Sequence, residues 1–191
     1  MSVKSIMIVG VGGQGTLLAS RIIGNALVDC GYDVKVSEVH GMSQRGGSVV
    51  TYVRYGEEVS SPIVEKGGAD IIVAFEQMEA LRWVSYLKPN GKMIINTQKI
   101  DPMPVITGAA VYPDDILETL KNAGVSYEAI DALALANEAG NAKAVNVVLL
   151  GLMAKHSEIE KETWLSSLRA TVPERFLDLN LKAFELGYNN H

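Results

Sequence analysis

A glycine-rich sequence, Gly10-Val11-Gly12-Gly13-Gln14-Gly15, lies between a short apolar run and a segment with helical periodicity. This order predicts a strand–turn–helix unit at the start of an α/β fold. Residues 4–9 are rich in isoleucine and valine, which predicts a buried strand before the glycines. In a strand–turn–helix unit Gly10 permits the tight turn, Gly12 lets a ligand approach the backbone, and Gly15 lets helix and strand pack closely. Free N–H groups at the helix start favour an anion, so the loop predicts a nucleotide or phosphate site. A glycine turn needed only for packing is the alternative.

Outward from this loop, the pattern predicts one α/β domain over residues 1–191. A strand over residues 33–39 would complete a right-handed, Rossmann-like βαβ unit and therefore a parallel sheet. The remaining predicted elements are strands at 69–75, 92–96 and 127–130, a hairpin of 49–55 with 59–64, and helices at 17–27, 76–87, 113–122, 163–172 and 173–186. We therefore expect a doubly wound, mostly parallel sheet, followed by a mainly helical portion at 133–191.

One predicted helix, residues 141–156, is apolar nearly all round, which is typical of a helix buried on every side. Asn146 lies inside it, and a buried amide needs a hydrogen-bond partner.

Composition excludes several classes of function. The 191 residues carry 17 basic and 22 acidic side chains, a net charge of −5, which argues against a nucleic-acid-binding surface. The single cysteine, Cys30, cannot form an intramolecular disulfide, a four-cysteine zinc site or an iron–sulfur cluster. Any electron-transfer centre must therefore sit on another chain. We find no export signal and no apolar run near the ~20 residues of a membrane span, so we expect a cytoplasmic protein.

A second polar loop follows the strand predicted at 33–39. It should lie beside the first loop, because both follow the carboxyl ends of strands. Glu38 stands where a dinucleotide-binding protein holds a ribose hydroxyl. Arg45, followed by two glycines, suits close approach to an anion or docking of a partner, with a solvated surface arginine as the alternative. His40 is interpreted as a hydrogen-bonded structural residue rather than a proton carrier.

These two loops together resemble a known family. Residues 38–47 read E-V-H-G-M-S-Q-R-G-G, which closely resembles the small (beta, gamma-type) subunit of the indolepyruvate:ferredoxin oxidoreductases, within the 2-oxoacid:acceptor oxidoreductases. The resemblance continues through residues 70–76 and 79–82 and the helix that holds Asn146. The resemblance covers nearly the whole chain, and the M-S-Q-R-G-G sequence favours the branch of the family that acts on arylpyruvates.

The resemblance implies one subunit of an enzyme. In this family a large partner subunit carries thiamine diphosphate and iron–sulfur clusters, and a 2-oxoacid such as indolepyruvate is decarboxylated oxidatively to an acyl-coenzyme A with reduction of ferredoxin. The small subunit of the heterodimer is then expected to hold no cofactor or metal alone, to supply no catalytic residue, and to contact coenzyme A. Glu76 follows a strand end and should also face the crevice. The expected binding residues are Gly10, Gly12, Gly13, Gln14, Gly15, Glu38, Ser43, Gln44, Arg45, Gly46 and Glu76.

Two other readings stay open. Glu38 is compatible with an NAD(P)-binding oxidoreductase that acts alone, or with a nucleotide-binding module that has no catalytic role.

An isolated chain would leave its partner-facing surface uncovered, and a homodimer is the expected way to cover part of it. Neither nucleic acid nor membrane is an expected partner.

Arg45 gives the first testable prediction. A guanidinium in this crevice can hold a phosphate or carboxylate with two hydrogen bonds, which lysine cannot reproduce. Both Arg45→Lys and Arg45→Ala should therefore lose roughly 1.5–3 kcal/mol of interaction, or about ten- to a hundredfold in kcat/KM of the reconstituted enzyme. Thermal melts of the isolated chain should stay unchanged. Unaltered kinetics in Arg45→Ala would reduce this residue to a surface charge.

Overall fold

The computed structural model describes residues 2–40 and 46–190. The strands are β1 (Lys4–Val11), β2 (Asp33–His40), β3 (Ser48–Gly56), β4 (Ala69–Ala74), β5 (Leu87–Asn96) and β6 (Tyr127–Ile130). The helices are α1 (Thr16–Asp29), α2 (Gln77–Trp83), α3 (Met103–Ile106), α4 (Ile116–Asn122), α5 (Ala132–Ala139), α6 (Val145–Lys155), α7 (Lys161–Thr171) and α8 (Leu177–Tyr188), with 3₁₀ turns at Val84–Tyr86, Ala142–Ala144 and Glu174–Phe176. Among the described residues, every helix is too short or too polar to cross a bilayer.

In the described part of the chain, six strands form one sheet in the order β2-β3-β1-β4-β5-β6. β4 is parallel to β1 and to β5, and β5 is parallel to β6. β3 is antiparallel to both of its neighbours, β1 and β2, which therefore run in the same direction. The expected α/β fold with a mostly parallel sheet is confirmed, with one reversed strand inserted into the initial βαβ unit.

The predicted hairpin of residues 49–55 with 59–64 is wrong. β3 lies between β1 and β2 and is almost completely buried, so both of its edges are used for pairing within the sheet. Side chains satisfy the backbone of the following segment instead. The Val59 N–H donates to Asp33 at 2.8 Å, and Arg54 donates to the carbonyl oxygens of Ser61 and Ile63 at 2.9 and 3.1 Å.

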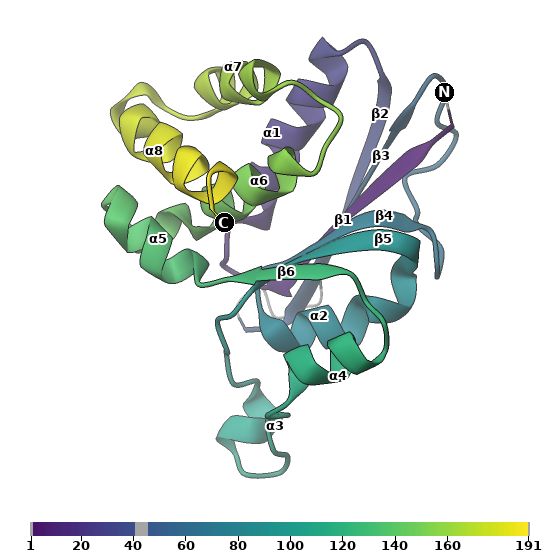
Figure 1. The fold of residues 1–191 in the computed structure, drawn as a ribbon, viewed down its shortest axis with the longest axis vertical. Helices are drawn as coiled ribbons and strands as arrows, with labels where there is room; N and C mark the ends of the chain where they lie inside the picture. The colour runs from purple at the N-terminus through teal and green to yellow at the C-terminus, as the bar shows by residue number, and fades with distance from the viewer. Residues whose placement is uncertain (1, 41–45, 191) are drawn as a thin grey trace.

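Helices cover both faces of the sheet, as Figure 1 shows. α1 and α5 to α8 lie on one face, and α2 and α4 lie on the other. Alternation along β1 explains the division, because Ile6 and Ile8 join the core under the first group while Met7 and Val9 join the core under the second. A buried parallel sheet of this kind needs apolar residues on both faces of its strands.

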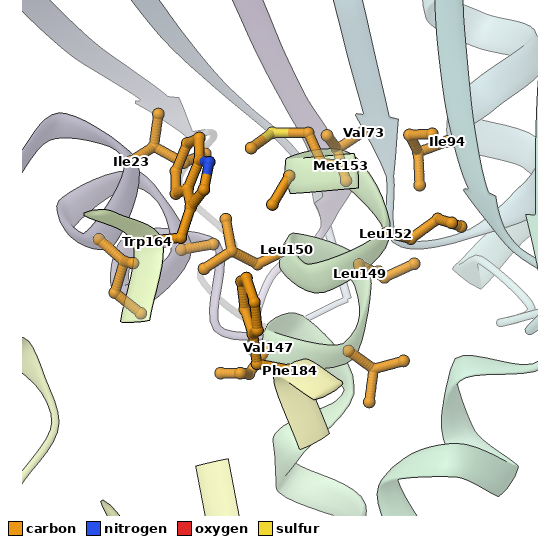
Figure 2. Close-up of a cluster of buried hydrophobic side chains, with 14 of the residues drawn as sticks. Ile23, Val73, Ile94, Val147, Leu149, Leu150, Leu152, Met153, Trp164 and Phe184 are labelled. Carbon is orange, nitrogen blue, oxygen red and sulfur yellow. The ribbon is translucent and has the colours of Figure 1, made fainter. Parts of the chain in front are cut away.

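α6 is the centre of the larger core, and Figure 2 shows its side chains among those of the sheet and the outer helices. Every residue from 145 to 154 is buried, which confirms the helix predicted to be apolar on all sides. Val73 and Ile94 of the sheet, with Trp164 of α7 and Phe184 of α8, belong to the same cluster (Figure 2).

α6 and α8 approach so closely that glycine is required at their crossing. A Cβ at Gly151 of α6 would overlap the carbonyl oxygen of Phe184, and it would lie 2.9 Å from the Tyr188 nitrogen. A Cβ at Gly187 of α8 would overlap the carbonyl oxygen of Val148. Both contacts are with backbone atoms, which cannot rotate away.

Substituting either glycine should separate the two helices. We expect Gly151→Ala and Gly187→Ala each to lower the free energy of unfolding by about 3 kcal/mol, the upper end of overpacking costs. Urea unfolding followed by circular dichroism measures this change. Gly24→Ala in α1 is the matched control: its Cβ would come no closer than 3.8 Å to Val36, so it should be neutral or stabilising by up to about 1 kcal/mol. Equal stabilities for all three variants would contradict the close crossing.

Candidate functional site

The glycine loop joins β1 to α1 at the carboxyl edge of the sheet. Gly13 and Gly15 have φ angles of +100° and +84°, a left-handed conformation that favours glycine. Gly15 is the N-cap of α1, and within the described residues no side chain caps that helix. The first N–H groups of α1 are therefore left for a ligand, and the helix dipole favours an anion there.

Gln14 shapes the loop from inside. Its Oε1 atom accepts a hydrogen bond from the Val11 N–H at 2.7 Å, and its Nε2 atom donates to the Phe75 carbonyl at 2.9 Å. A Cβ at Gly10 would lie 2.8 Å from the same Oε1 atom and 3.0 Å from the Cβ of Phe75, which explains the glycine there. The amide of Gln14 thus ties the end of β1 to the end of β4.

Asn146, in the buried helix α6, supports the loop from below. Its Nδ2 atom donates to the Gly15 carbonyl at 3.2 Å, and its Oδ1 atom accepts from the Val147 N–H at 2.9 Å. The partner expected for this buried amide is therefore present. A Cβ at Gly15 would lie 2.6 Å from Nδ2, so close packing is a second reason for glycine at this position.

The described end of the second loop, Gly46 and Gly47, lies beside the first loop. The Gly12 N–H donates to the Gly47 carbonyl at 2.9 Å, and Gly46 is exposed with a φ of +76°. Ser43, Gln44 and Arg45 lie outside the described residues.

The buried carboxylate of Glu79 holds the end of this second loop. The sequence did not predict Glu79 as part of the site. Glu79 of α2 accepts hydrogen bonds from the Ser48 hydroxyl at 2.5 Å and from the Trp83 indole N–H at 3.2 Å. It also pairs with Arg82 at 3.1 Å. The i+3 and i+4 spacing of Arg82 and Trp83 was visible in the sequence, but the contact with Ser48, 31 residues away, was not.

Glu38 and the glycine loop face one cavity. Glu38 is exposed at the end of β2, and its carboxylate lies 3.5 Å from the Thr51 hydroxyl. The cavity, about 410 Å³, is lined by Gly12, Gly13, Gly15, Thr16, Leu17, Glu38 and Val49.

A second cavity flanks the glycine loop. It measures about 460 Å³ and is lined by Gly13, Gln14, Gly15, Gln98, Leu133, Ala142, Lys143 and Val145. Lys143 is exposed and makes no ion pair with any residue that the structure describes. Its charge favours an anionic group in this cavity, whose lining also includes Gly15, the N-cap of α1.

Glu76 follows β4 as predicted, but its carboxylate is fully buried. It accepts hydrogen bonds from the N–H groups of Glu79 and Ile100, both at 3.1 Å, and from the hydroxyl of Tyr112. Burial and the neighbouring Glu76 raise the pKa of Tyr112, which keeps the phenol protonated as a donor. Within the described residues, then, the Glu76 carboxylate is used by the protein itself as a helix cap and a tether.

The Gln14 bridge generates a prediction. In Gln14→Glu the bond from Val11 is kept, but a carboxylate oxygen replaces the N–H group that faces the Phe75 carbonyl. We expect the free energy of unfolding to fall by about 1–3 kcal/mol at pH 7, measured in urea. Gln98→Glu is the matched control, because the Gln98 amide oxygen accepts from Asn96 Nδ2 at 3.3 Å and a carboxylate can do the same. Equal effects of the two substitutions would show that the bridge has no special role.

Comparisons with known proteins agree with this arrangement. The family model described as pyruvate ferredoxin/flavodoxin oxidoreductase matches residues 5–190. The indolepyruvate oxidoreductase subunit IorB of Thermococcus kodakarensis is 44% identical and aligns with 98% of this chain and 95% of its own.

Two solved structures have the same fold. The crystal structure of a pyruvate oxidoreductase subunit from Thermotoga maritima matches with a TM-score of 0.74 at 21% identity. The match covers 98% of this chain and 96% of that one. A 2-oxoglutarate:ferredoxin oxidoreductase from Magnetococcus marinus, solved with 2-oxoglutarate, coenzyme A and succinyl-CoA bound, has a TM-score of 0.74 at 22% identity. There the match covers 98% of this chain but 30% of that one. From the family match over almost its whole length, the chain belongs to the pyruvate ferredoxin/flavodoxin oxidoreductase family.

Proposed function

We propose that this chain is the small subunit of a ferredoxin-dependent 2-oxoacid oxidoreductase that acts on arylpyruvates such as indolepyruvate. The observation that carries the proposal is the hydrogen bond from Gly12 to Gly47, the last residue of the M-S-Q-R-G-G sequence, because it brings the end of that sequence to the glycine loop. The identity of 44% to an indolepyruvate oxidoreductase subunit supports the choice of substrate. Residues 1–191 are proposed to act as a single gamma-type domain.

The redox and thiamine chemistry is assigned to a large partner subunit, to which ferredoxin also binds. An iron–sulfur cluster needs several thiolates, and Cys30 is the only cysteine in the chain. The residues present therefore do not fit a cluster. Thiamine diphosphate, when bound to the partner, supplies the electron sink for decarboxylation.

The role proposed for the small subunit is to bind an anionic group of coenzyme A. The ammonium of Lys143 supplies a donor on one side of the glycine loop. The first residues of α1, Thr16 and Leu17, line the cavity on the other side, where the helix start favours an anion. Glu38, on the other side, supplies a carboxylate that can accept from a ribose hydroxyl. Ser43, Gln44, Arg45 and Gly46 complete this proposed site, with Gly10, Gln14 and Glu76 as its supports.

An NAD(P)-binding oxidoreductase that acts alone, or a simple nucleotide-binding module, is not favoured by the family match. Glu38 beside the glycine loop remains compatible with a dinucleotide, so binding of NAD(H) belongs in the test. Cytoplasmic location of the complex stays a prediction.

Reconstitution tests the proposal. The purified chain should be colourless, free of bound iron and inactive on 2-oxoacids. With the large subunit from the same source it should reduce ferredoxin in the presence of indolepyruvate and coenzyme A. Calorimetry of the isolated chain should detect coenzyme A and not NAD(H), and light scattering should show whether it forms a homodimer.

Three results would contradict the proposal. The first is ferredoxin-linked turnover by the chain alone, the second is stoichiometric iron in it, and the third is tight binding of NAD(H) without binding of coenzyme A. Lys143→Ala should bind coenzyme A more weakly, whereas the control Lys182→Ala on α8 should bind it as the wild type does. This difference would support the assignment of the second cavity. Lys182 is exposed, donates to the Glu138 carbonyl and lines neither of the two cavities.

A further inference from the structure

The segment 97–115, which we call the arm, connects β5 to α4 and contains the single turn of α3. It starts at the carboxyl edge of the sheet, and Gln98 near its beginning lines the same cavity as Gly13 to Gly15. Figure 1 shows α3 at the far end of the molecule, beyond α2 and α4 and away from the sheet. The arm therefore extends from the candidate site into solvent.

The tip of the arm is apolar and uncovered. Met103, Ile106 and Val111 are 66%, 65% and 86% exposed, while Val105 packs inward against the core under α2 and α4. Met103 and Ile106 are three residues apart in α3 and so share one outward face. A helical turn with one face on the core normally shows polar residues on the opposite face, and this one does not.

Hydrogen bonds hold the arm firmly at its base, so it is an ordered element rather than a loose loop. The buried carboxylate of Glu76 accepts from the Ile100 N–H at one end of the arm and from the Tyr112 hydroxyl at the other. The Tyr112 oxygen in turn accepts from the Met78 N–H at 3.1 Å. Near the tip, the Ala110 N–H donates to the Pro104 carbonyl at 3.0 Å. An element ordered before binding loses less conformational entropy when it binds.

The chemistry of the tip defines its partner. Residues 102–112, which include the tip, carry no charged side chain. Lys99 and Asp101 precede them, with Lys99 over the Tyr112 ring at 5.4 Å, and Asp114 and Asp115 follow them at the end of the arm that leads into α4. A surface of this kind complements an apolar protein surface and offers little to a nucleic acid or a charged headgroup. An active complex must bring the candidate site to the subunit that holds thiamine diphosphate, and the arm projects from that same edge. In the Magnetococcus marinus protein the matching region makes up 30% of one longer chain, so there the fold is joined covalently to further protein.

We propose that the arm docks the large partner subunit, which receives Met103, Ile106 and Val111 in an apolar depression of its surface. The inference rests on the proposed function, because it needs that subunit. It adds the surface by which the two chains recognise each other, at a distance from the glycine loop.

The experiment compares two triple variants of the full chain. The arm variant is Met103→Ser/Ile106→Ser/Val111→Ser, and the control is Val28→Ser/Ile63→Ser/Phe176→Ser, which removes three exposed apolar side chains elsewhere. Affinity for the purified large subunit is measured by biolayer interferometry. We expect the arm variant to bind roughly a hundredfold more weakly and the control to bind as the wild type does. Both should melt as the wild type does, because the replaced side chains are exposed.

Turnover then separates docking from chemistry. At saturating concentrations of the arm variant, the rate of ferredoxin reduction should return to that of the wild-type complex, because the variant changes only the assembly. Equal affinities of the arm variant and the wild type would overturn the docking surface and leave the proposed function intact. Loss of a homodimer in the arm variant, with unchanged affinity for the large subunit, would assign the arm to a second copy of this chain instead. Failure of the wild-type chain to bind or activate the large subunit would overturn the proposed function itself.

Discussion

The carbonyl oxygen of Phe75 is the point on which the carboxyl edge of the sheet depends. It accepts hydrogen bonds from Gln14 Nε2 at 2.9 Å and from Asn96 Nδ2 at 3.1 Å, and the Phe75 N–H donates to the Val9 carbonyl at 2.8 Å. Three parallel strands, β1, β4 and β5, are thereby joined where they end. The glycine loop continues directly from this junction, and Gly13 and Gly15 adopt their left-handed conformation there without steric cost.

A consequence is that the buried polar side chains near the site serve the protein rather than a ligand. Asn96 also accepts from the Ala132 N–H, Asn146 holds Gly15, and Glu79 holds Ser48. Each of these groups is buried and would be costly without partners. Among the described residues, the proposed ligand contacts therefore fall on backbone N–H groups and on side chains at the rim such as Glu38 and Lys143.

Sequence patterns could predict what depends on neighbours along the chain. The apolar run before Gly10 and the all-apolar helix α6 were identifiable because burial on both faces leaves no polar periodicity. The place of β3 was not identifiable, since a fully buried strand has the same local pattern whether it pairs with the next segment or with β1 and β2. Glu76 could be seen to follow a strand, but its partner Tyr112 lies 36 residues away. Only the three-dimensional structure brings such pairs together.

The proposed ligand site and the proposed docking surface both start from one edge of the sheet, and two successive residues, Phe75 and Glu76, connect them. The carbonyl of Phe75 holds the glycine loop through Gln14, while the side chain of Glu76 holds both ends of the arm. The hydrogen bonds that hold the glycine loop and those that hold the arm therefore start from adjacent residues, joined by one planar peptide unit. This arrangement suits the role proposed for this chain, in which the redox centres belong to the partner subunit. Such a subunit contributes by presenting a bound group to the partner in a fixed orientation. That orientation is preserved only if the arm and the glycine loop are rigidly connected to each other.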